Sequence, residues 1–325
     1  MRAVAAAKVM REPVLRGELH EREPMSRHVS WRAGGHAERS YEPADLADLQ
    51  AFLATRPAGE AIHFVGLGSN LLVRDGGLRG TVVFTHWALH AMRIDASRCE
   101  FTAGAGVACP KIARLAAVNG CAGAEFLAGI PGTLGGALAM NAGCYGGETW
   151  DFVTRVQTID RLGNLRDRTP ADYDISYRSV LRKADGVTPK ADGTLPSPLI
   201  RHPSEEWFVA ATLRFSRGDG QAARQRIREL LARRLATQPL GEPNAGSVFR
   251  NPPNDHAARL IESCGLKGRA IGAAVVSARH ANFIVNRGKA CARDIEALIE
   301  LVRRSVREKF GIELECEVRI IGEQG

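Results

Sequence analysis

A glycine-rich stretch near the middle of the chain constrains the fold most. Seven of the twenty residues in 129–148 (GIPGTLGGALAMNAGCYGGE) are glycine, out of 34 glycines among 325 residues. Glycine has no Cβ and readily adopts positive φ, so such a backbone can approach a ligand closely and point several N–H groups at it. A flexible turn is the simpler alternative, but the apolar Ile130, Leu134, Leu138 and Met140 favour a packed loop. The stretch therefore predicts a loop in contact with a cofactor.

A second, shorter glycine loop, GLGSN at residues 66–70, follows the apolar run 62–65. A strand that delivers a turn to a phosphate has this form. The standard nucleotide motifs do not match: Leu71 stands where the third glycine of the dinucleotide fingerprint belongs, and neither GxxxxGKS nor GxxxxGKT occurs. The two loops together suggest one extended cofactor bound by neither a Rossmann nor a P-loop site.

The length of the chain allows two or three domains, each with its own core. Every apolar run is far shorter than the roughly 20 residues that span a bilayer. The N-terminal apolar run ends at Lys8, too early for a secretory signal, whose apolar core has about 7–15 residues. These features predict a cytoplasmic protein that does not bind membranes.

The seven cysteines form an odd set without a CxxC pair, which predicts reduced and mostly buried thiols. They stand at positions 99, 109, 121, 144, 264, 291 and 316. Among the histidines only His86 and His90 have the i,i+4 spacing of a helical metal site, and no carboxylate accompanies them as in HExxH. We therefore predict no metal site.

The formal net charge of +8 suits a polyanionic small molecule or a nucleic acid, and charge alone does not separate the two. The most basic run, 224–234, has Ile227, Leu230 and Leu231 at helical spacing, so it predicts an amphipathic helix with a solvated basic face. It also lacks the interleaved aromatic residues on which bases stack. A nucleic-acid-binding module stays open as an alternative from a different class.

The remaining pattern predicts an α+β chain in three segments: a loosely ordered extension at 1–25, a cofactor-binding domain at 26–218 and a smaller domain at 219–325. Periodicity and turn residues predict helices at 43–56, 110–119, 220–234, 257–264 and 292–310. They predict strands at 62–65, 81–85, 152–160, 165–168, 207–215, 270–276, 282–285 and 314–321, two strands within 92–106, and 152–168 as a hairpin. Four prolines and two glycines within 185–204 predict a surface insertion.

Six motifs follow one another along the chain: GLGSNLLVRDGG, GIPGTLGGALAMNAGCYGGE, SYRS, AGSVFRNP, HANFIVN and CEVRIIG. Together they closely resemble the UDP-N-acetylenolpyruvoylglucosamine reductase family, from Ser26 to Gly322. The resemblance implies a two-part FAD-binding domain of the vanillyl-alcohol-oxidase type, without a Rossmann core, and a smaller α+β substrate-binding domain after it. It also implies that NADPH reduces UDP-N-acetylglucosamine enolpyruvate to UDP-N-acetylmuramate, in peptidoglycan precursor synthesis.

By this resemblance, noncovalently bound FAD lies against both glycine loops, with the first loop near its diphosphate. The implied FAD contacts are Gly66, Leu67, Gly68, Ser69, Asn70, Gly129, Ile130, Pro131, Gly132, Gly136, Asn141, Ala142 and Gly143. The implied substrate contacts are Tyr177, Asn251, His280 and Asn282.

The resemblance places three catalytic residues. Arg178 of SYRS and Glu317 of CEVRIIG would lie at the substrate carboxylate, the arginine as a cation and the glutamate as a protonated donor, which requires a raised pKa. Ser247 of AGSVFRNP would deliver a proton to the carbon that bears the carboxylate.

The residue pattern by itself favours simpler roles. Glu317 falls on the polar face of the last predicted strand, as a solvated carboxylate would. Ser247 follows a glycine, as a turn or capping hydroxyl often does, and Asn251 before Pro252 suits a turn. Only the motif matches support the catalytic and binding roles.

A rival within the enzymes is an oxidase of the same flavin-domain superfamily with covalently attached FAD. Cys144, inside the long glycine loop, could carry such a bond.

Overall fold

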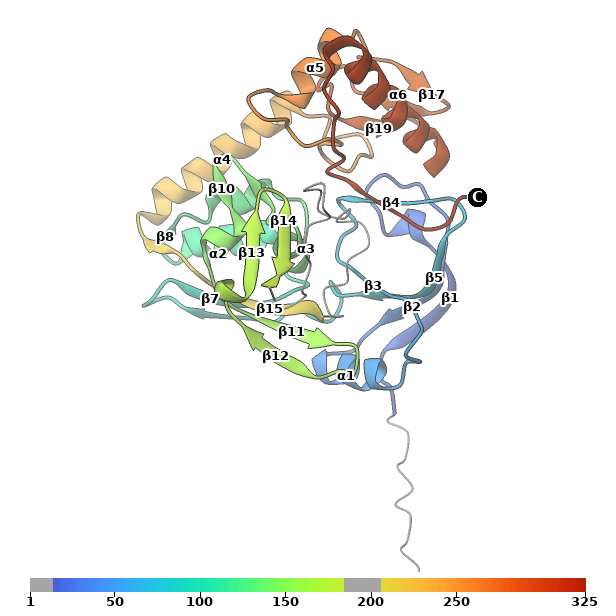
Figure 1. Cartoon of the computed structure of the whole chain (residues 1–325). Helices are drawn as coiled ribbons and strands as arrows, with labels where there is room; N and C mark the ends of the chain where they lie inside the picture. Colours follow the sequence, from blue (N-terminus) through green and yellow to red (C-terminus); the bar gives the residue numbers. More distant parts are fainter. Residues whose placement is uncertain (1–13, 184–205) are drawn as a thin grey trace, which may run out of the picture.

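The computed structural model shows two sheets side by side, with a separate C-terminal unit lying across one end of both (Figure 1). The structure describes residues 14–183 and 206–325. Residues 1–13 of the predicted extension and the insertion predicted at 185–204 lie outside the described residues.

The first sheet has four strands in the order β1-β2-β5-β3, with β1 antiparallel to β2 and β5 parallel to both of its neighbours. Its strands are β1 (Glu18–Pro24), β2 (His36–Glu42), β3 (Ile62–Val65) and β5 (Leu78–Phe84). Helix α1 (Leu46–Ala54) follows β2. The predicted start of this helix at Pro43 is wrong, because the Asp45 carboxylate caps the helix by accepting from the Asp48 N–H at 2.9 Å.

The prediction of a loosely ordered extension through residue 25 is wrong for its last part. Residues Glu18–Pro24 form β1, paired from Glu18↔Glu42 to Pro24↔His36, and a 3-10 turn η1 (Met25–Arg27) follows. Most β1 side chains are exposed, so the strand has no apolar alternation to reveal it. Backbone pairing at the edge of the sheet holds it instead.

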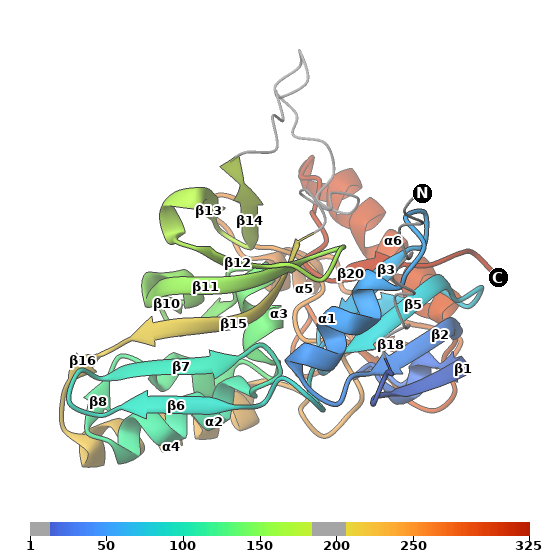
Figure 2. The ribbon, with the colours of Figure 1, turned by 90° about the horizontal axis from the view of Figure 1, so that it is seen from below.

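The second sheet has five strands in the order β12-β11-β15-β7-β6, all antiparallel. They are β6 (Met92–Asp95), β7 (Glu100–Gly104), β11 (Val153–Asp160), β12 (Leu165–Arg168) and β15 (Glu206–Arg214). The pairing of β11 with β12 confirms the predicted hairpin. Helices α2 (Cys109–Val118) and α4 (Gly220–Thr237) pack on each other beside β6 and β7 (Figure 2).

The glycine-rich stretch is a series of short elements rather than a flexible turn. Its Leu134 and Leu138 are fully buried and Ile130 is nearly so. The short elements here and nearby are β8 (Cys121–Ala122), η2 (Glu125–Gly129), α3 (Leu134–Ala139), β9 (Gly143–Cys144), β10 (Gly147–Glu148), η3 (Thr149–Asp151), η4 (Pro170–Asp172), β13 (Tyr173–Ser176), β14 (Ser179–Arg182) and β16 (Ser216–Arg217).

The C-terminal unit packs two helices on a three-stranded antiparallel sheet in the order β17-β18-β19. Its elements are α5 (Ala257–Ser263), β17 (Ala270–Ile271), β18 (Ala274–Val276), β19 (Ile284–Asn286) and α6 (Ala292–Phe310). The single strand predicted at 270–276 is wrong, because Gly272, at φ +53°, turns the chain and makes a hairpin of it. The buried face of α6 repeats at helical spacing through Ile295, Leu298 and Val302, which confirms the predicted helix.

The last strand leaves the C-terminal unit and joins the first half of the chain. Strand β20 (Arg319–Ile321) pairs in parallel with β4 (Leu71–Val73), which directly follows the first glycine loop. The strand predicted at 314–321 is therefore shorter than expected. Residues 314–318 connect the C-terminal unit to β20.

Trp31, from the N-terminal half of the sequence, is buried in the core of the C-terminal unit. Its side chain is completely buried beside Leu72 and α6 residues such as Leu298. Its Nε1–H donates to the carbonyl of Ile284 at 2.7 Å. The two units therefore share one continuous core at this point.

The prediction that all cysteines are reduced is wrong for one pair. Cys99 and Cys121 are joined by a disulfide, with their Cα atoms 5.7 Å apart and both residues buried. They are 22 residues apart in sequence, and it is the fold that brings the turn before β7 next to β8. The other five cysteines are free thiols.

In the parts of the chain that the structure covers, residues 14–183 and 206–325, no helix has the length and apolar composition to cross a membrane. The same residues contain no group of three or more histidine, cysteine or acidic side chains arranged to hold a metal ion.

We predict that Trp31→Phe destabilises the protein by about 1–3 kcal/mol, because the buried Ile284 carbonyl loses its donor. Trp87, which is 58% exposed, offers a matched control. Trp87→Phe should change stability by less than about 0.5 kcal/mol. Urea unfolding followed by circular dichroism measures both, and equal effects of the two substitutions would contradict a structural role for the Trp31 hydrogen bond.

Candidate active site

The structure brings the two glycine loops together. A Cβ on Gly66 would collide with the Thr133 side chain, and a Cβ on Gly132 would lie 3.1 Å from Ser69 Oγ. Glycine at both positions therefore lets the two backbones run against each other. This contact fits the prediction that both loops line one cofactor site.

Features of the loops fit a flat, extended cofactor such as FAD. Gly68 has φ +57°, and a Cβ there would collide with the His28 carbonyl, so this turn requires glycine. The Thr133 hydroxyl is buried and, within the described residues, has no hydrogen-bond partner. Leu67, at the tip of the first loop, is 42% exposed, which leaves an apolar side chain for a ligand to cover. The chain thus offers turned backbone, a free hydroxyl and apolar surface in one place.

Asn141, one of the predicted FAD contacts, has its side chain engaged within the protein. Its Nδ2 donates to Glu148 Oε2 at 2.7 Å and to the Ser176 carbonyl at 3.2 Å, while its Oδ1 accepts from the Trp150 N–H at 3.1 Å. The residue is buried and has φ +43°. Its side chain therefore holds the loop together, and only its backbone is left for a ligand.

Arg178 lies at the tip of the β13–β14 hairpin. It has φ +57°, a conformation that costs a residue other than glycine on the order of 1–3 kcal/mol. Its guanidinium donates to the carbonyls of Asn141 and Gly143 at 3.4 and 2.9 Å. Its Nε lies 2.8 Å from Glu317 Oε1. The hairpin thus points the arginine at the end of the glycine-rich stretch and at the C-terminal segment.

Glu317 is enclosed, although the sequence pattern favoured a solvated carboxylate. Its side chain is only 14% exposed, and it belongs to the connecting segment before β20 rather than to a strand with a solvated face. Burial raises the pKa of the carboxyl, opposed by the nearby charges of Arg178 and Arg250. The direction agrees with the prediction of a protonated donor.

Ser247 lies close to this pair through the backbone. The carbonyl of the next residue, Val248, accepts from the Glu317 N–H at 2.8 Å, and Phe249 bridges to Cys316. Among the described residues, the Ser247 hydroxyl has no hydrogen-bond partner. The fold therefore gathers Arg178, Glu317 and Ser247 from three separate segments.

Asn282 supports the Ser247 loop. Its Oδ1 accepts from the Phe249 N–H at 2.9 Å and its Nδ2 donates to the Phe249 carbonyl at 2.8 Å. The residue is only 4% exposed. These bonds favour a supporting role for Asn282 over the predicted substrate contact.

The other predicted substrate residues differ in position. Tyr177 is 46% exposed at the hairpin tip, with its ring 5.2 Å from the Arg178 guanidinium. Asn251 accepts from the Ala257 N–H at 3.1 Å and so supports the start of α5. His280 packs edge to face on Phe283 within the C-terminal unit, and burial lowers its pKa. Their contacts with a substrate stay predictions.

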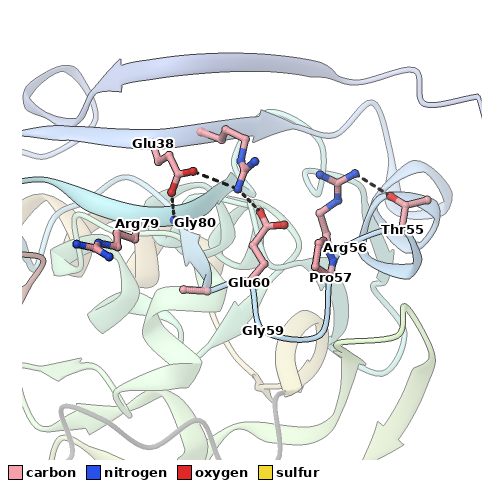
Figure 3. Close-up of a pocket in the computed structure, with 10 residues that line it drawn as sticks. Glu38, Thr55, Arg56, Pro57, Gly59, Glu60, Arg79 and Gly80 are labelled. Carbon is pink, nitrogen blue, oxygen red and sulfur yellow. Dashed lines mark hydrogen bonds and ion pairs between the residues drawn. The ribbon is translucent and has the colours of Figure 1, made fainter.

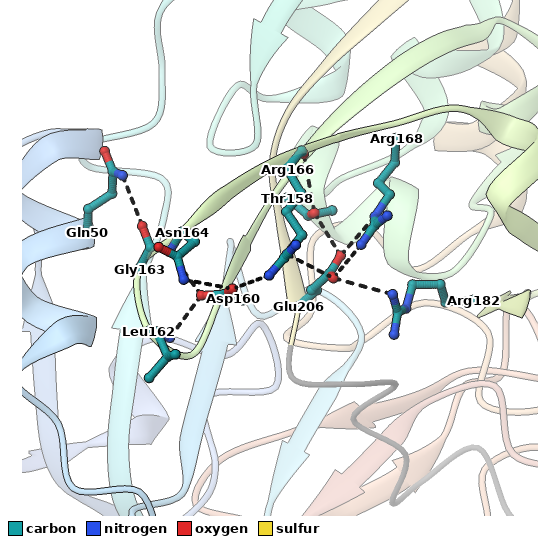
Figure 4. Close-up of polar contacts among 10 residues, drawn as sticks. All are labelled: Gln50, Thr158, Asp160, Leu162, Gly163, Asn164, Arg166, Arg168, Arg182 and Glu206. Carbon is teal, nitrogen blue, oxygen red and sulfur yellow. Dashed lines mark hydrogen bonds and ion pairs between the residues drawn. The ribbon is translucent and has the colours of Figure 1, made fainter. Parts of the chain in front are cut away.

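A buried polar cluster holds the base of the Arg178 hairpin, and the sequence analysis missed it. The Glu206 carboxylate, 7% exposed, binds Arg168 at 2.7 Å and Arg182 at 3.5 Å and accepts from the Thr158 hydroxyl at 2.9 Å (Figure 4). Burial alone would raise the pKa of Glu206, but the hydrogen bonds from Arg168 and Thr158 and the charges of Arg168 and Arg182 keep it lowered. Nothing in the sequence distinguishes Glu206 from other acidic residues, because its partners come from β11, β12 and β14.

Figure 3 shows a surface hollow bounded by β2, β5 and the loop after α1, which contains none of the predicted site residues. Its Arg39 already pairs with Glu38 at 3.4 Å and Glu60 at 3.3 Å. The charge of Arg39 is therefore already paired with two carboxylates.

Cys144, which could carry a covalent flavin, is an unreactive thiol here. Its Sγ donates to the Phe126 carbonyl at 2.9 Å, and burial raises its pKa to about 11. A thiol that is not ionised at neutral pH is a poor nucleophile.

The raised pKa of Glu317 predicts how stability depends on pH. A carboxyl whose pKa is raised above its ordinary 4.5 in the folded state stabilises the fold most below pH 4.5 and loses this contribution as pH rises through the folded pKa. Glu317→Gln removes the titration. We therefore expect the melting temperature of the wild type to fall relative to Glu317→Gln as pH rises from 4 to 8.

The control for this experiment is Glu315→Gln, which changes an exposed carboxylate two residues away. Glu315→Gln should leave the pH dependence of the melting temperature the same as in the wild type. If instead the wild type gains stability over Glu317→Gln as pH rises, the arginines outweigh burial and Glu317 is ionised.

Comparison with known proteins gives the family of the chain. Residues 38–168 match the family model described as an FAD binding domain, and residues 238–321 match the one described as the C-terminal domain of UDP-N-acetylenolpyruvoylglucosamine reductase. These matches and the fold confirm the predicted class, an FAD-binding domain of this type followed by a smaller α+β domain.

Two curated relatives match nearly the whole chain. The UDP-N-acetylenolpyruvoylglucosamine reductase of Nitrosospira multiformis is 58% identical, over 95% of this chain and 90% of its own. That of Thiobacillus denitrificans is 54% identical, over 96% and 94%.

A solved structure points to the same family. The crystal structure of UDP-N-acetylenolpyruvylglucosamine reductase from Thermus caldophilus superposes with a TM-score of 0.73 at 28% identity, covering 94% of this chain and 99% of that one. On this evidence the chain belongs to the UDP-N-acetylenolpyruvoylglucosamine reductase family.

Proposed function

We propose that the protein reduces UDP-N-acetylglucosamine enolpyruvate to UDP-N-acetylmuramate with NADPH as the hydride donor. The observation that carries the proposal is the meeting of Arg178, Glu317 and Ser247 beside two glycine loops that are in contact with each other. Membership of the reductase family is the basis for naming this substrate. The same membership supports a place in peptidoglycan precursor synthesis.

The residues that would hold FAD are the two glycine loops, residues 66–70 and 129–143. When bound, FAD supplies a carrier that takes a hydride from NADPH and passes it to the terminal vinyl carbon of the substrate. The protein's own side chains then manage charge and protons.

Arg178 and Glu317 would bind the substrate carboxylate. Negative charge spreads into this carboxylate when hydride adds to the vinyl group, so fixed donors stabilise the enolate-like species more than the substrate. Arg178 contributes a permanent cation. Burial raises the pKa of Glu317, and in its protonated form Glu317 would contribute a hydrogen bond without adding a second negative charge.

Ser247 would protonate the carbon that bears the carboxylate. Hydride adds to one end of the double bond and the serine proton to the other, which gives the lactyl ether; solvent then restores the serine proton. A hydroxyl is a weak acid, but the enolate that it quenches is a strong base. The absence of a partner for Ser247 within the described residues leaves its proton available.

We also propose a division of the chain into an FAD-binding and a substrate-binding domain. The sequence placed the boundary between residues 218 and 219. The packing of α4 on α2 and η2 favours a boundary after Thr237, since it attaches α4 to the first domain.

Preference for NADPH and a cytoplasmic location rest on the family alone.

We predict that the purified protein contains about one FAD per chain, as expected for one site, bound without a covalent bond. Acid denaturation should release all of the yellow colour into the supernatant, and Cys144→Ser should behave as the wild type does. Flavin that stays on the denatured polypeptide would support the rival oxidase instead. A protein without flavin, whose nucleic-acid affinity falls steeply with salt, would support the binding module.

Ser247→Ala should slow reoxidation of the NADPH-reduced enzyme by the enolpyruvyl substrate by about 10²–10⁴-fold, or roughly 3–5 kcal/mol of barrier. Flavin content and the reduction of the flavin by NADPH should stay near wild type, because neither step transfers a proton to the substrate. Stopped-flow absorbance separates the two half-reactions. Cysteine at position 247, a stronger acid, should recover part of the rate.

The matched control is Ser277→Ala, which removes a turn hydroxyl in the same unit that accepts from the Arg279 N–H at 3.2 Å. It should reduce stability by about 1 kcal/mol and leave reoxidation unchanged. If reoxidation of Ser247→Ala lies within about tenfold of wild type, Ser247 is not the general acid.

A further inference from the structure

The hairpin that carries Arg178 depends on side chains for its position. Strands β13 and β14 form a two-stranded sheet of their own and pair with no other strand among the described residues. A two-stranded hairpin is marginally stable by itself. Its base is held by the Glu206 cluster through Arg182. Its tip, which carries Arg178, lies at the other end, where Asn141 Nδ2 donates to the Ser176 carbonyl at 3.2 Å.

Arg250, in the AGSVFRNP motif, provides a tether at the tip. Its Nη2 donates to the carbonyl oxygen of Arg178 at 3.2 Å. Its own backbone is fixed by the Arg250 N–H, which donates to the Glu315 carbonyl at 2.9 Å. The guanidinium thus connects the turn that holds Arg178 to the segment that holds Glu317.

Each nitrogen of the Arg250 guanidinium has a defined environment. Nη2 binds the Arg178 carbonyl, Nη1 lies 3.6 Å from the Glu315 carboxylate, and Nε is enclosed without a partner in the described part of the chain. The Arg250 side chain is 21% exposed, close to the 15% of Arg178, so its contacts and not its burial indicate its role. The arrangement suits a residue that acts through its neighbour.

We propose that Arg250 is a positioning residue: by binding the Arg178 carbonyl it holds the left-handed turn at the hairpin tip and so fixes the Arg178 guanidinium beside Glu317, ready for the carboxylate of the substrate. This inference rests on the proposed function.

The test compares Arg250→Met with the wild type in two measurements on the FAD-loaded enzyme. The first is amide hydrogen exchange of residues 173–182 without substrate. The second is the dissociation constant of UDP-N-acetylglucosamine enolpyruvate, from the change that it causes in the flavin spectrum and from calorimetry. We expect exchange at the hairpin tip to accelerate at least tenfold and the substrate to bind at least tenfold more weakly, with flavin content unchanged.

Two variants make the test specific. Arg250→Lys keeps a cationic donor on a long side chain and should stay within about threefold of the wild type in both measurements. Glu315→Gln removes the exposed partner of Arg250 and spares the contact with Arg178, so it should change neither measurement by more than twofold. If Arg250→Met does not fold, Arg250→Gln serves instead, because its shorter side chain cannot span the distance to the Arg178 carbonyl.

Three results would overturn the proposal. Weaker substrate binding with unchanged exchange would make Arg250 a direct substrate contact. Faster exchange with unchanged affinity would show that the turn does not need to be held. An equal effect of Glu315→Gln would assign the role to the Glu315 pair. A wild-type enzyme that does not bind the sugar nucleotide at all would reject the proposed function, which is a separate outcome.

Discussion

The candidate site depends on one crossing of the chain, the passage of Leu314–Val318 from the C-terminal unit to the first glycine loop. Along this segment the Glu317 N–H binds Val248, the Glu317 carbonyl accepts from Asn70 Nδ2 at 3.0 Å, and the Glu317 side chain meets Arg178. One residue therefore contacts both units and the hairpin. The parallel pairing of β20 with β4 keeps the segment in register, since a shift by one residue would turn the Glu317 side chain to the opposite face. The geometry of the candidate site and the packing of the C-terminal unit on the rest of the chain therefore depend on the same set of contacts.

The electrostatic environment of Glu317 follows from this position. Burial favours the neutral carboxyl, whereas Arg178 and Arg250 favour the carboxylate, and burial has the larger effect. A neutral Glu317 would leave the arginines their full positive charge for a ligand. An anionic substrate would pair with the two arginines. Its carboxylate would accept a hydrogen bond from the protonated carboxyl of Glu317. A cluster with a neutral Glu317 would thus present donors and positive charge suited to a bound anion.

The sequence predicted the features that depend on local patterns. The helices at 110–119 and 292–310, the 152–168 hairpin and the packed glycine loops all follow from periodicity, capping residues and glycine content, and the structure has them. Contacts between distant segments left no such signal. β1 has exposed side chains, Cys99 meets Cys121 only in the fold, and the burial of Glu317 depends on where β20 begins. Arg250 and Glu206 act on backbone and side chains far away in sequence, so no spacing rule points to them.

Backbone strain also collects at the site, and the contacts there explain why it persists. Asn141 and Arg178 both have positive φ, and each lies in a turn that contacts the other: the Arg178 guanidinium binds the Asn141 carbonyl, and Asn141 Nδ2 binds the Ser176 carbonyl of the hairpin. Left-handed residues other than glycine persist where the surrounding structure over-determines them. Here two strained turns hold each other, and Arg250 and Trp150 hold them from outside. The strain is therefore tolerated, because releasing either turn would break contacts of both turns. The same contacts fix the Arg178 side chain in one orientation before the substrate arrives.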